Sequence, residues 1–348
     1  MKYGLIVFIN TDNIGDDIQS YALEKFFPHV DYLVDREKLD SFHTKTGETV
    51  ATIFGGWYLH RALNWPPSPF LNPILPISIH FRMKNFIMDD YGGEWLKKFS
   101  PIGCRDEGTL ENLKNFGIQG YLSGCCTLTL TPFENVTKHG KIILTDLPEE
   151  TAEFVKARTK KETVVISHKP RESAQLIRAI AESAARKILF DADGKEPIPF
   201  QKMTWAQRRI LVEELLKFYQ GASLVVTSRL HAALPCLALG TPVFLVSDKR
   251  KNYRFSTFIP YINSTNTKNL LDGKFLYDFD APKASPGGHE KFAENIRRIC
   301  NDFITACEND GKTFSIDVET WLDGHNKNQR LKKIITDLNP EKKFLRKF

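Results

Sequence analysis

The chain has 348 residues, of which 42% are hydrophobic and 26% are charged, as is ordinary for a water-soluble globular protein. Its length exceeds that of one hydrophobic core, so we expect two domains. No window holds 18 consecutive apolar residues, so no transmembrane helix is predicted, and the opening stretch MKYGLIVFIN turns polar too early for a signal peptide. The sequence therefore predicts a cytoplasmic protein.

The net charge of +6 at pH 7 is concentrated at the C-terminus. Residues 326–348 hold eight Lys or Arg and two Asp or Glu, so the preceding 325 residues are balanced at 40 of each sign. This distribution argues against a nucleic-acid-binding face on the folded body. Because Phe344, Leu345 and Phe348 lie between the cations, the tail fits peripheral contact with an anionic membrane. The alternative is a solvated, partly helical tail that packs on its own body or is disordered.

Cysteine and histidine spacing gives no sign of a metal centre. The six cysteines form no CxxC pair, and the sequence has no HExxH motif. We therefore expect reduced thiols, no metal and no cofactor.

Strand and helix patterns alternate in the first part of the chain. The apolar run 4–9 predicts a strand, and apolar residues at helical spacing over 16–27 predict a helix. Residues 49–57 predict another strand. The proline-rich stretch 63–81 indicates an extended surface loop. Residues 105–118 begin with acidic side chains and run to a glycine, as a helix with a glycine C-cap does.

The alternation restarts after residue 137. Four apolar runs predict buried parallel strands, at 141–146, 163–167, 223–228 and 241–247. Helical patterns lie between or after them, at 149–159, 172–187, 204–219 and 231–239. The sequence thus predicts an α/β protein of two Rossmann-like, doubly wound domains that face a cleft, residues 1–136 and 137–325, followed by the basic tail 326–348.

Three side chains that suit an anion follow the strand at 223–228. In open α/β sheets, ligands bind outside the carboxyl ends of the strands, where Ser228, Arg229 and His231 fall. Arg229 can grip a carboxylate or phosphate in bidentate fashion, and His231 can exchange a proton near neutral pH. The alternative is structural, with Arg229 paired to a carboxylate at the domain interface and His231 as a helix cap.

The stretch TSRLHAALPCLALGTPVF closely resembles the C-terminal motif of the polysaccharide pyruvyl transferase family. The resemblance extends, in the expected order, to NTDNIGDDIQSYAL, FGGW and CRDEGTLENLKNFGIQGYLSGCCTLTL. It implies a GT-B-like pair of Rossmann domains, with the acceptor on the first and phosphoenolpyruvate on the second. It also implies transfer of a pyruvyl group from phosphoenolpyruvate to a sugar of a cell-surface polysaccharide, such as an exopolysaccharide precursor. Arg229, His231 and the backbone of Leu230 are then expected to hold the donor.

Ketal formation from phosphoenolpyruvate begins with protonation of its methylene carbon, and His231 is our candidate for the acid. A sugar hydroxyl adds to the central carbon, phosphate leaves, and a second hydroxyl closes the ring. Asp16 and Asp17 follow Gly15 in the first strand-to-helix turn. One of them is expected to cap the helix and the other to orient or deprotonate a sugar hydroxyl.

Other residues have both a functional and a structural interpretation. Arg105 is a candidate to reach the cleft from the first domain, whereas Asp106 fits a helix N-cap better than a catalytic role. His168 ends a predicted strand, where it would line the donor site or bond a loop carbonyl. The cluster Lys249, Arg250, Lys251 and Arg254 would bind phosphate or form a solvated loop. Trp57 and Trp65 would stack on a sugar or pack within a surface loop.

Two other functions remain open on sequence grounds. One is a GT-B glycosyltransferase that uses a nucleotide sugar, although the short loop TSRLH offers no acidic partner for a ribose. The other is a non-catalytic module that binds glycans.

Overall fold

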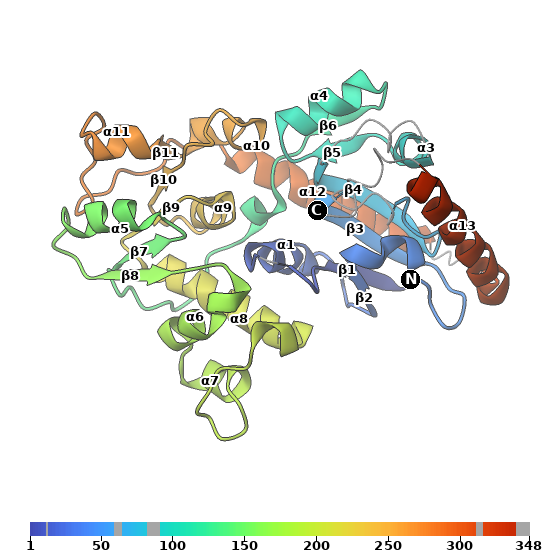
Figure 1. Ribbon diagram of the computed structural model, residues 1–348, viewed down its shortest axis with the longest axis horizontal. Helices are drawn as coiled ribbons and strands as arrows, with labels where there is room; N and C mark the ends of the chain where they lie inside the picture. Colours follow the sequence, from blue (N-terminus) through green and yellow to red (C-terminus); the bar gives the residue numbers. More distant parts are fainter. Residues whose placement is uncertain (12, 59–64, 82–90, 311–315, 339–348) are drawn as a thin grey trace. The chain divides into compact units, whose positions relative to one another are not determined.

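In the computed structural model, the described residues are 1–348 apart from 12, 59–64, 82–90, 311–315 and 339–348 (Figure 1). They form two compact units. The first comprises Met1–Ile9, Leu23–Gly124 and Asn295–Phe348, and the second comprises Asn10–Ala22 and Cys125–Glu294. Each unit contains one parallel sheet, so the mixed α/β class is confirmed, while the GT-B-like cleft stays a prediction.

The sheet of the first unit has six strands in the order β2-β1-β3-β4-β5-β6. The strands are β1 (Tyr3–Val7), β2 (Tyr32–Asp35), β3 (Val50–Tyr58), β4 (Leu71–Phe81), β5 (Ile102–Cys104) and β6 (Gly120–Leu122). Helical segments in this unit are η1 (Arg36–Ser41), α3 (Tyr91–Lys98), α4 (Glu107–Asn115), most of α12 (Glu290–Asp310) and α13 (Val318–Leu338). As predicted, α4 ends before a glycine of positive φ, Gly117, because a left-handed residue closes the helix there.

The prediction of a surface loop over 63–81 is wrong for its second half. Residues 71–81 form β4, which pairs with β3 on one side and β5 on the other. Ile77, Ile79 and Phe81 are fully buried, and this apolar burial outweighs the donors lost at two prolines. The pairing of β3 with β4 is interrupted by two shifts of register, and such irregularities tolerate missing backbone donors.

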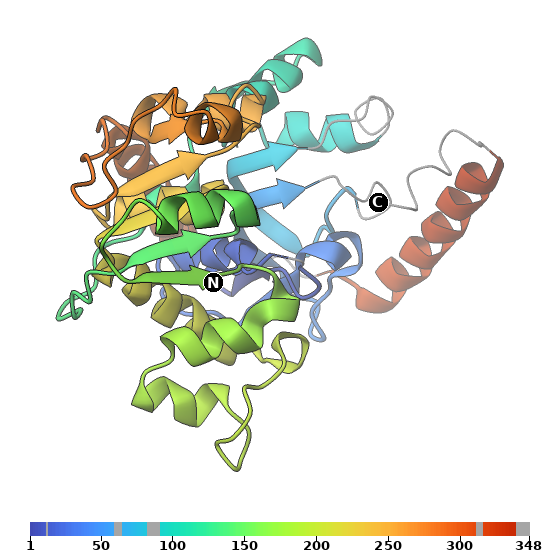
Figure 2. The same cartoon turned by 60° about the vertical axis from the view of Figure 1, so that its left-hand side comes forward.

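The second unit has a five-stranded sheet in the order β11-β10-β9-β7-β8, whose strands lie side by side in Figure 2. The strands are β7 (Ile142–Thr145), β8 (Thr163–Ile166), β9 (Leu224–Thr227), β10 (Val243–Val246) and β11 (Asn263–Thr265). The four predicted strands are therefore confirmed, and their pairing is parallel throughout.

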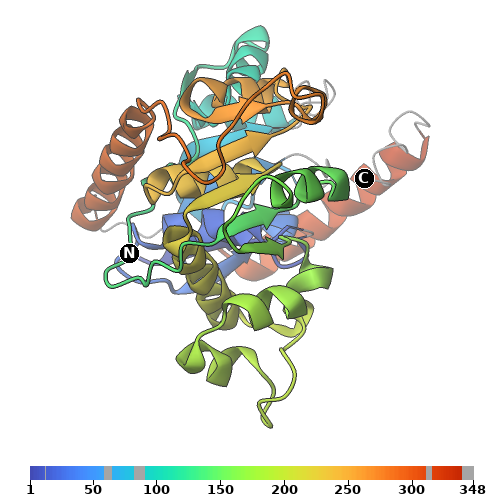
Figure 3. The same cartoon turned by 90° about the vertical axis from the view of Figure 1, so that its left-hand side faces the viewer.

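Helices surround this second sheet, with α6, α7 and α8 grouped at one side of it (Figure 3). The predicted helix 172–187 is divided into two, α6 and α7. The helical segments are α5 (Glu149–Lys156), α6 (Ser173–Ile180), α7 (Ser183–Leu189), α8 (Trp205–Gly221), α9 (Leu230–Ala238), α10 (Tyr253–Ser256), α11 (Thr267–Leu271), η3 (Cys126–Thr129), η4 (Pro170–Glu172), η5 (Phe200–Lys202) and η6 (Ile259–Tyr261). In the described part of the chain, no helix is both long enough and apolar enough to cross a membrane.

The chain does not divide into two consecutive halves. Most of α1 (Gly15–Glu24) belongs to the second unit, where the backbone N–H of Ile14 donates to the carbonyl of His168 at 2.8 Å. The chain returns to the first unit from Asn295 onward. The boundaries between the two units therefore do not fall at residues 136 and 325. The assignment of one domain to the acceptor and the other to the donor stays a prediction.

The basic tail begins inside a helix. Residues 326–338 continue α13, which is 21 residues long, so this part of the tail is helical. Trp321, near the start of α13, packs edge-on against Phe70, with their ring centroids 5.0 Å apart. This contact holds the start of the helix against the rest of the first unit. Residues 339–348, including Pro340, Phe344, Leu345 and Phe348, lie outside the described residues.

Candidate active site

A pocket of about 720 Å³ opens at the carboxyl ends of four strands in the second unit. Its walls carry the residues that follow each strand: Asp146 after β7, Ser167 and Lys169 after β8, Ser228 to His231 after β9, and Ser247 to Lys249 after β10. This is the edge at which open parallel sheets bind ligands. Ser228, Arg229 and His231, the residues singled out from the sequence, therefore line this pocket.

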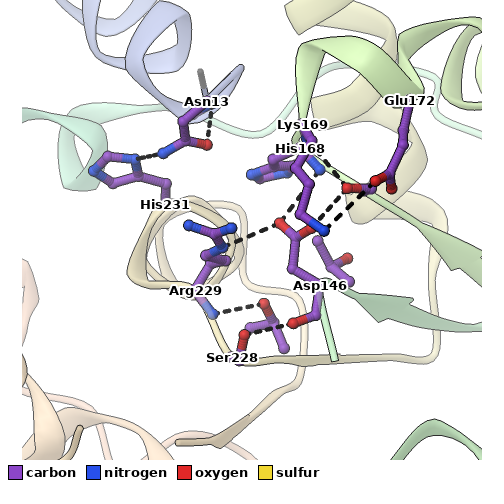
Figure 4. Close-up of polar contacts among 12 residues, drawn as sticks. Asn13, Asp146, His168, Lys169, Glu172, Ser228, Arg229 and His231 are labelled. Atoms are coloured by element: carbon purple, nitrogen blue, oxygen red, sulfur yellow. Dashed lines mark hydrogen bonds and ion pairs between the residues drawn. The ribbon is translucent and has the colours of Figure 1, made fainter. Parts of the chain in front are cut away.

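Asp146, one of the lining residues, makes polar contacts with several of its neighbours, as Figure 4 shows. Its φ of 51° turns the chain sharply at the end of β7, in a conformation that aspartate tolerates better than most residues. One carboxylate oxygen accepts a hydrogen bond from Ser167 Oγ at 2.7 Å, and the other lies 3.3 Å from Arg229 Nε. Ser228 Oγ donates to the Asp146 carbonyl at 2.6 Å. Asp146 thus ties the end of β7 to the turn after β9.

Arg229 is positioned with part of its guanidinium group still available. Its side chain is 41% exposed, and Nε faces Asp146. Within the described ranges, its two terminal nitrogens donate no hydrogen bond to another residue. Both can therefore donate hydrogen bonds to the same oxyanion. The residue is also the N-cap of α9, with no side chain capping that helix. The backbone N–H groups that begin at Leu230 add partial positive charge to the same place.

His231 lies in the first turn of α9 and is 7% exposed. Its Nδ1 is 2.8 Å from Asn13 Nδ2 and 3.7 Å from Asp16 Oδ1. Space for the ring exists because residue 15 is glycine: a Cβ there would lie only 2.4 Å from His231 Cβ. Asn13 and the start of α1 therefore pack closely against this histidine.

The two acidic candidates of α1 differ in their surroundings. Asp16 is 6% exposed and accepts hydrogen bonds from Thr11 Oγ1 at 2.7 Å and Gln19 Nε2 at 3.2 Å. Asp17 is fully buried, 3.7 Å from Arg208 Nη1. Burial raises the pKa of Asp17 to about 8, although the Arg208 charge acts in the opposite direction. Neither aspartate lines the pocket, so their assigned roles in acceptor chemistry stay predictions.

His168 lies behind the pocket wall. It is 1% exposed, and its Nε2 is 2.7 Å from the hydroxyl of Tyr219. Burial lowers the pKa of His168 to about 4, with the Asp146 charge opposing this shift and the Arg229 charge adding to it. His168 is not among the residues that line the pocket, so a role for it in donor binding stays a prediction.

Arg105 and Asp106 belong to the first unit, and neither lines this pocket. Asp106 is the N-cap of α4, as predicted, and its Oδ1 accepts from the Thr109 backbone at 2.9 Å. Its Oδ2 lies 2.7 Å from His80 Nδ1. Burial acts to raise the pKa of Asp106, but the hydrogen bond and charge of His80 lower it overall. Arg105 is 4% exposed, and a role for it in substrate binding stays a prediction.

The remaining candidates divide between the pocket and the core. Lys249 and Arg254 line the pocket, whereas Arg250 and Lys251 are not among its lining residues. Trp65 is 5% exposed and packs edge-on against a second tryptophan at 4.7 Å, in the core of the first unit. For Trp65 the packing interpretation is therefore the better one.

The fold and the pocket together define an α/β protein with an arginine, a histidine and a helix N-terminus at the carboxyl edge of a parallel sheet. Residues 13–250 match the family model of polysaccharide pyruvyl transferases. The chain therefore belongs to the polysaccharide pyruvyl transferase family. In general terms this membership makes it a pyruvyl transferase of polysaccharide biosynthesis with a saccharide acceptor.

Comparisons with individual proteins add little. A comparison with curated proteins gives no match. One similar crystal structure is that of a functionally uncharacterised protein from Klebsiella pneumoniae subsp. pneumoniae NTUH-K2044. It is 13% identical, covers 74% of this chain and 88% of that chain, and has a TM-score of 0.42. This likeness is too weak to support an argument about function.

Proposed function

We propose that the protein transfers the pyruvyl group of phosphoenolpyruvate to two hydroxyls of a saccharide, which forms a pyruvate ketal and releases phosphate. The observation that carries the proposal is the position of Arg229, whose terminal nitrogens remain available beside the uncapped start of α9. Phosphoenolpyruvate is a small, dense anion with one carboxylate and one phosphate. A guanidinium group and helix N–H donors suit both groups.

The reaction needs one proton delivered and two removed. Protonation of the methylene carbon by His231 makes the central carbon electrophilic, and the first hydroxyl adds to it with loss of its proton to a base. Phosphate then departs from the same carbon with its bonding electrons. The second hydroxyl takes its place, loses its proton and closes the ring. Arg229 would stabilise the anionic groups throughout, and no step in this sequence changes an oxidation state.

Titration calorimetry with phosphoenolpyruvate tests the donor site. Charge-assisted hydrogen bonds contribute about 1.5–3 kcal/mol, so Arg229→Ala should weaken binding by about 10- to 150-fold. Arg229→Lys should also bind more weakly than the wild type, because an ammonium lacks the planar pair of donors. Arg178→Ala is the matched control: Arg178 has similar side-chain exposure, 44% against 41%, also pairs with a carboxylate, and lies away from the pocket.

Unchanged donor affinity in folded Arg229→Ala would refute this assignment. The same titration with UDP and GDP separates the other functions. Binding of a nucleotide without phosphoenolpyruvate would indicate a glycosyltransferase. Binding of neither would indicate a non-catalytic glycan-binding module.

We further propose that the acceptor is a lipid-linked saccharide at the cytoplasmic face of a membrane, and that the basic tail holds the protein there. The support is the excess of six positive charges in residues 326–348. Full-length protein should sediment with anionic vesicles at low salt, and 1 M salt, where the Debye length is about 3 Å, should release it. A chain lacking residues 340–348, which hold four Lys or Arg and one Glu, should sediment less than the full-length chain. Equal sedimentation of both chains would show that residues 340–348 are not the anchor.

A further inference from the structure

Asn13 fixes the side of the His231 ring that lies against α1. The Oδ1 atom of Asn13 accepts the backbone N–H of Gly15 at 3.1 Å, which sets the orientation of the amide. Its NH2 group therefore faces His231 Nδ1, at 2.8 Å. An amide NH2 group can only donate, so Nδ1 must accept, and the ring proton resides on Nε2. The geometry thus describes a neutral imidazole.

Asp16 favours the opposite state of the ring. Its Oδ1 lies 3.7 Å from the same Nδ1, where a carboxylate stabilises a protonated ring. A second proton on Nδ1 would instead point at the NH2 group of Asn13. Among the described residues, the other buried titratable or charged side chains near α9 are Asp17 on α1, Arg208, Glu214 and Tyr219 on α8, Cys126 on η3, Cys236 on α9 itself, and His168. Arg209, Glu213 and Lys217 on α8 and the neighbouring Arg229 are not fully buried.

We propose that Asn13 is a positioning residue that keeps the resting His231 neutral with its proton on Nε2, so that the ring becomes charged only when an anionic donor occupies the pocket. A bound trianion favours the imidazolium form. Nδ1 then becomes protonated, and its N–H donates a hydrogen bond either to the Asp16 carboxylate or to the side-chain oxygen of Asn13 after the amide has rotated. The proton comes from solvent, and the ring can subsequently deliver one to the methylene carbon. The part of this proposal that concerns the donor rests on the proposed function, whereas the resting tautomer does not.

The first experiment needs no substrate. In full-length protein labelled with ¹⁵N-histidine, two-bond ¹H–¹⁵N correlations distinguish a protonated from an unprotonated ring nitrogen, and His231→Gln identifies the signals. The wild type should show Nδ1 unprotonated and Nε2 protonated at pH 7. Asn13→Asp places an acceptor at Nδ1 and should give a ring protonated at both nitrogens, while Asn13→Ala should give a mixture of tautomers. Asn10→Ala is an exposed control on the same segment and should resemble the wild type.

The second experiment measures proton uptake when phosphoenolpyruvate binds. Calorimetry in buffers of different ionisation enthalpy, near pH 8 and so about two units above the second phosphate pKa, should give uptake approaching about one proton in the wild type. Uptake should fall toward zero in Asn13→Asp, whose ring is already charged, and stay unchanged in Asn10→Ala. This readout depends on protonation, so a purely structural role for Asn13 would not alter it.

The outcomes distinguish the proposed role of Asn13 from the proposed binding of phosphoenolpyruvate. If the ¹⁵N spectra of Asn13→Ala and Asn13→Asp match that of the wild type, the proposal for Asn13 is wrong. Equal proton uptake in the wild type and Asn13→Asp, when phosphoenolpyruvate binds both, overturns it as well. If the spectra change as expected but phosphoenolpyruvate does not bind to the wild type, the tautomer assignment stands and the proposed donor is wrong.

Discussion

Asp17 is a carboxyl group that the fold buries without a hydrogen bond. Neither of its oxygens has a hydrogen-bond partner in the described residues, and the Arg208 nitrogen 3.7 Å away is too distant to donate one. Arg208 instead lies over the ring of Phe200 at 4.1 Å. The loss of hydration therefore exceeds the attraction of Arg208, and the pKa of Asp17 rises from 3.8 to about 8.

This shift predicts how stability depends on pH. Between pH 3.8 and about 8, folded Asp17 retains a proton that the unfolded chain has lost. The Asp17 contribution to the free energy of unfolding is complete below this window and is lost as pH rises through it, at up to about 1.4 kcal/mol per pH unit. From pH 5 to pH 8 the loss is on the order of 4 kcal/mol. Asp17→Asn has nearly the same shape and no proton to lose, so it should lack this dependence.

Urea unfolding followed by circular dichroism at pH 5, 6, 7 and 8 measures the effect. The stability of the wild type should fall relative to Asp17→Asn as pH rises, whereas the exposed control Asp193→Asn should follow the wild type. Parallel curves for the wild type and Asp17→Asn would refute the reasoning, because they would mean that Arg208 keeps Asp17 ionised in the folded state. Loss of turnover in a variant with normal stability would instead support the catalytic role predicted for Asp17.

Three further substitutions test the surroundings of the pocket. His231→Gln should lower turnover by about 10²–10⁴-fold at saturating donor. Near-normal turnover would mean that another group is the acid. His168→Gln should cost about 1–3 kcal/mol in thermal or urea unfolding, because Tyr219 loses its 2.7 Å partner, with donor affinity unchanged in calorimetry. Gly15→Ala should cost about 1–3 kcal/mol and shift the His231 NMR signals, because its new Cβ meets His231; unshifted signals would contradict the contact.

The sequence predicted the second unit better than the first for a physical reason. The strands β7, β9 and β10 are buried along their whole length, so they appear as continuous apolar runs. In the first unit, β5 and β6 have only three residues each, which is too short for a periodic signal. The strand β4 contains prolines, and local rules favour a loop there. Its burial between β3 and β5 is a tertiary effect that no local pattern reveals.

Some residues of the candidate site could likewise be predicted from local sequence and others could not. Ser228, Arg229 and His231 were predictable because they directly follow an apolar run, and the end of a parallel strand is where ligands bind. Asp146 also follows such a run, so its position at the end of β7 was a usable signal for the site. Asn13 gave no comparable signal, since its role depends on a contact with a residue 218 positions away.

The contact of Asn13 with His231 joins the N-terminal piece of the second unit to its later part. Residues 10–22 supply the amide at His231 Nδ1, the carboxylate of Asp16 and the glycine that makes room for the ring. A fragment that began at residue 125 would retain the five strands and Arg229 but would leave Nδ1 of His231 without either of these partners. Asn13, Gly15 and Asp16, which surround the His231 ring, therefore come from the N-terminal piece, whereas Arg229 and His231 itself belong to the later sequence.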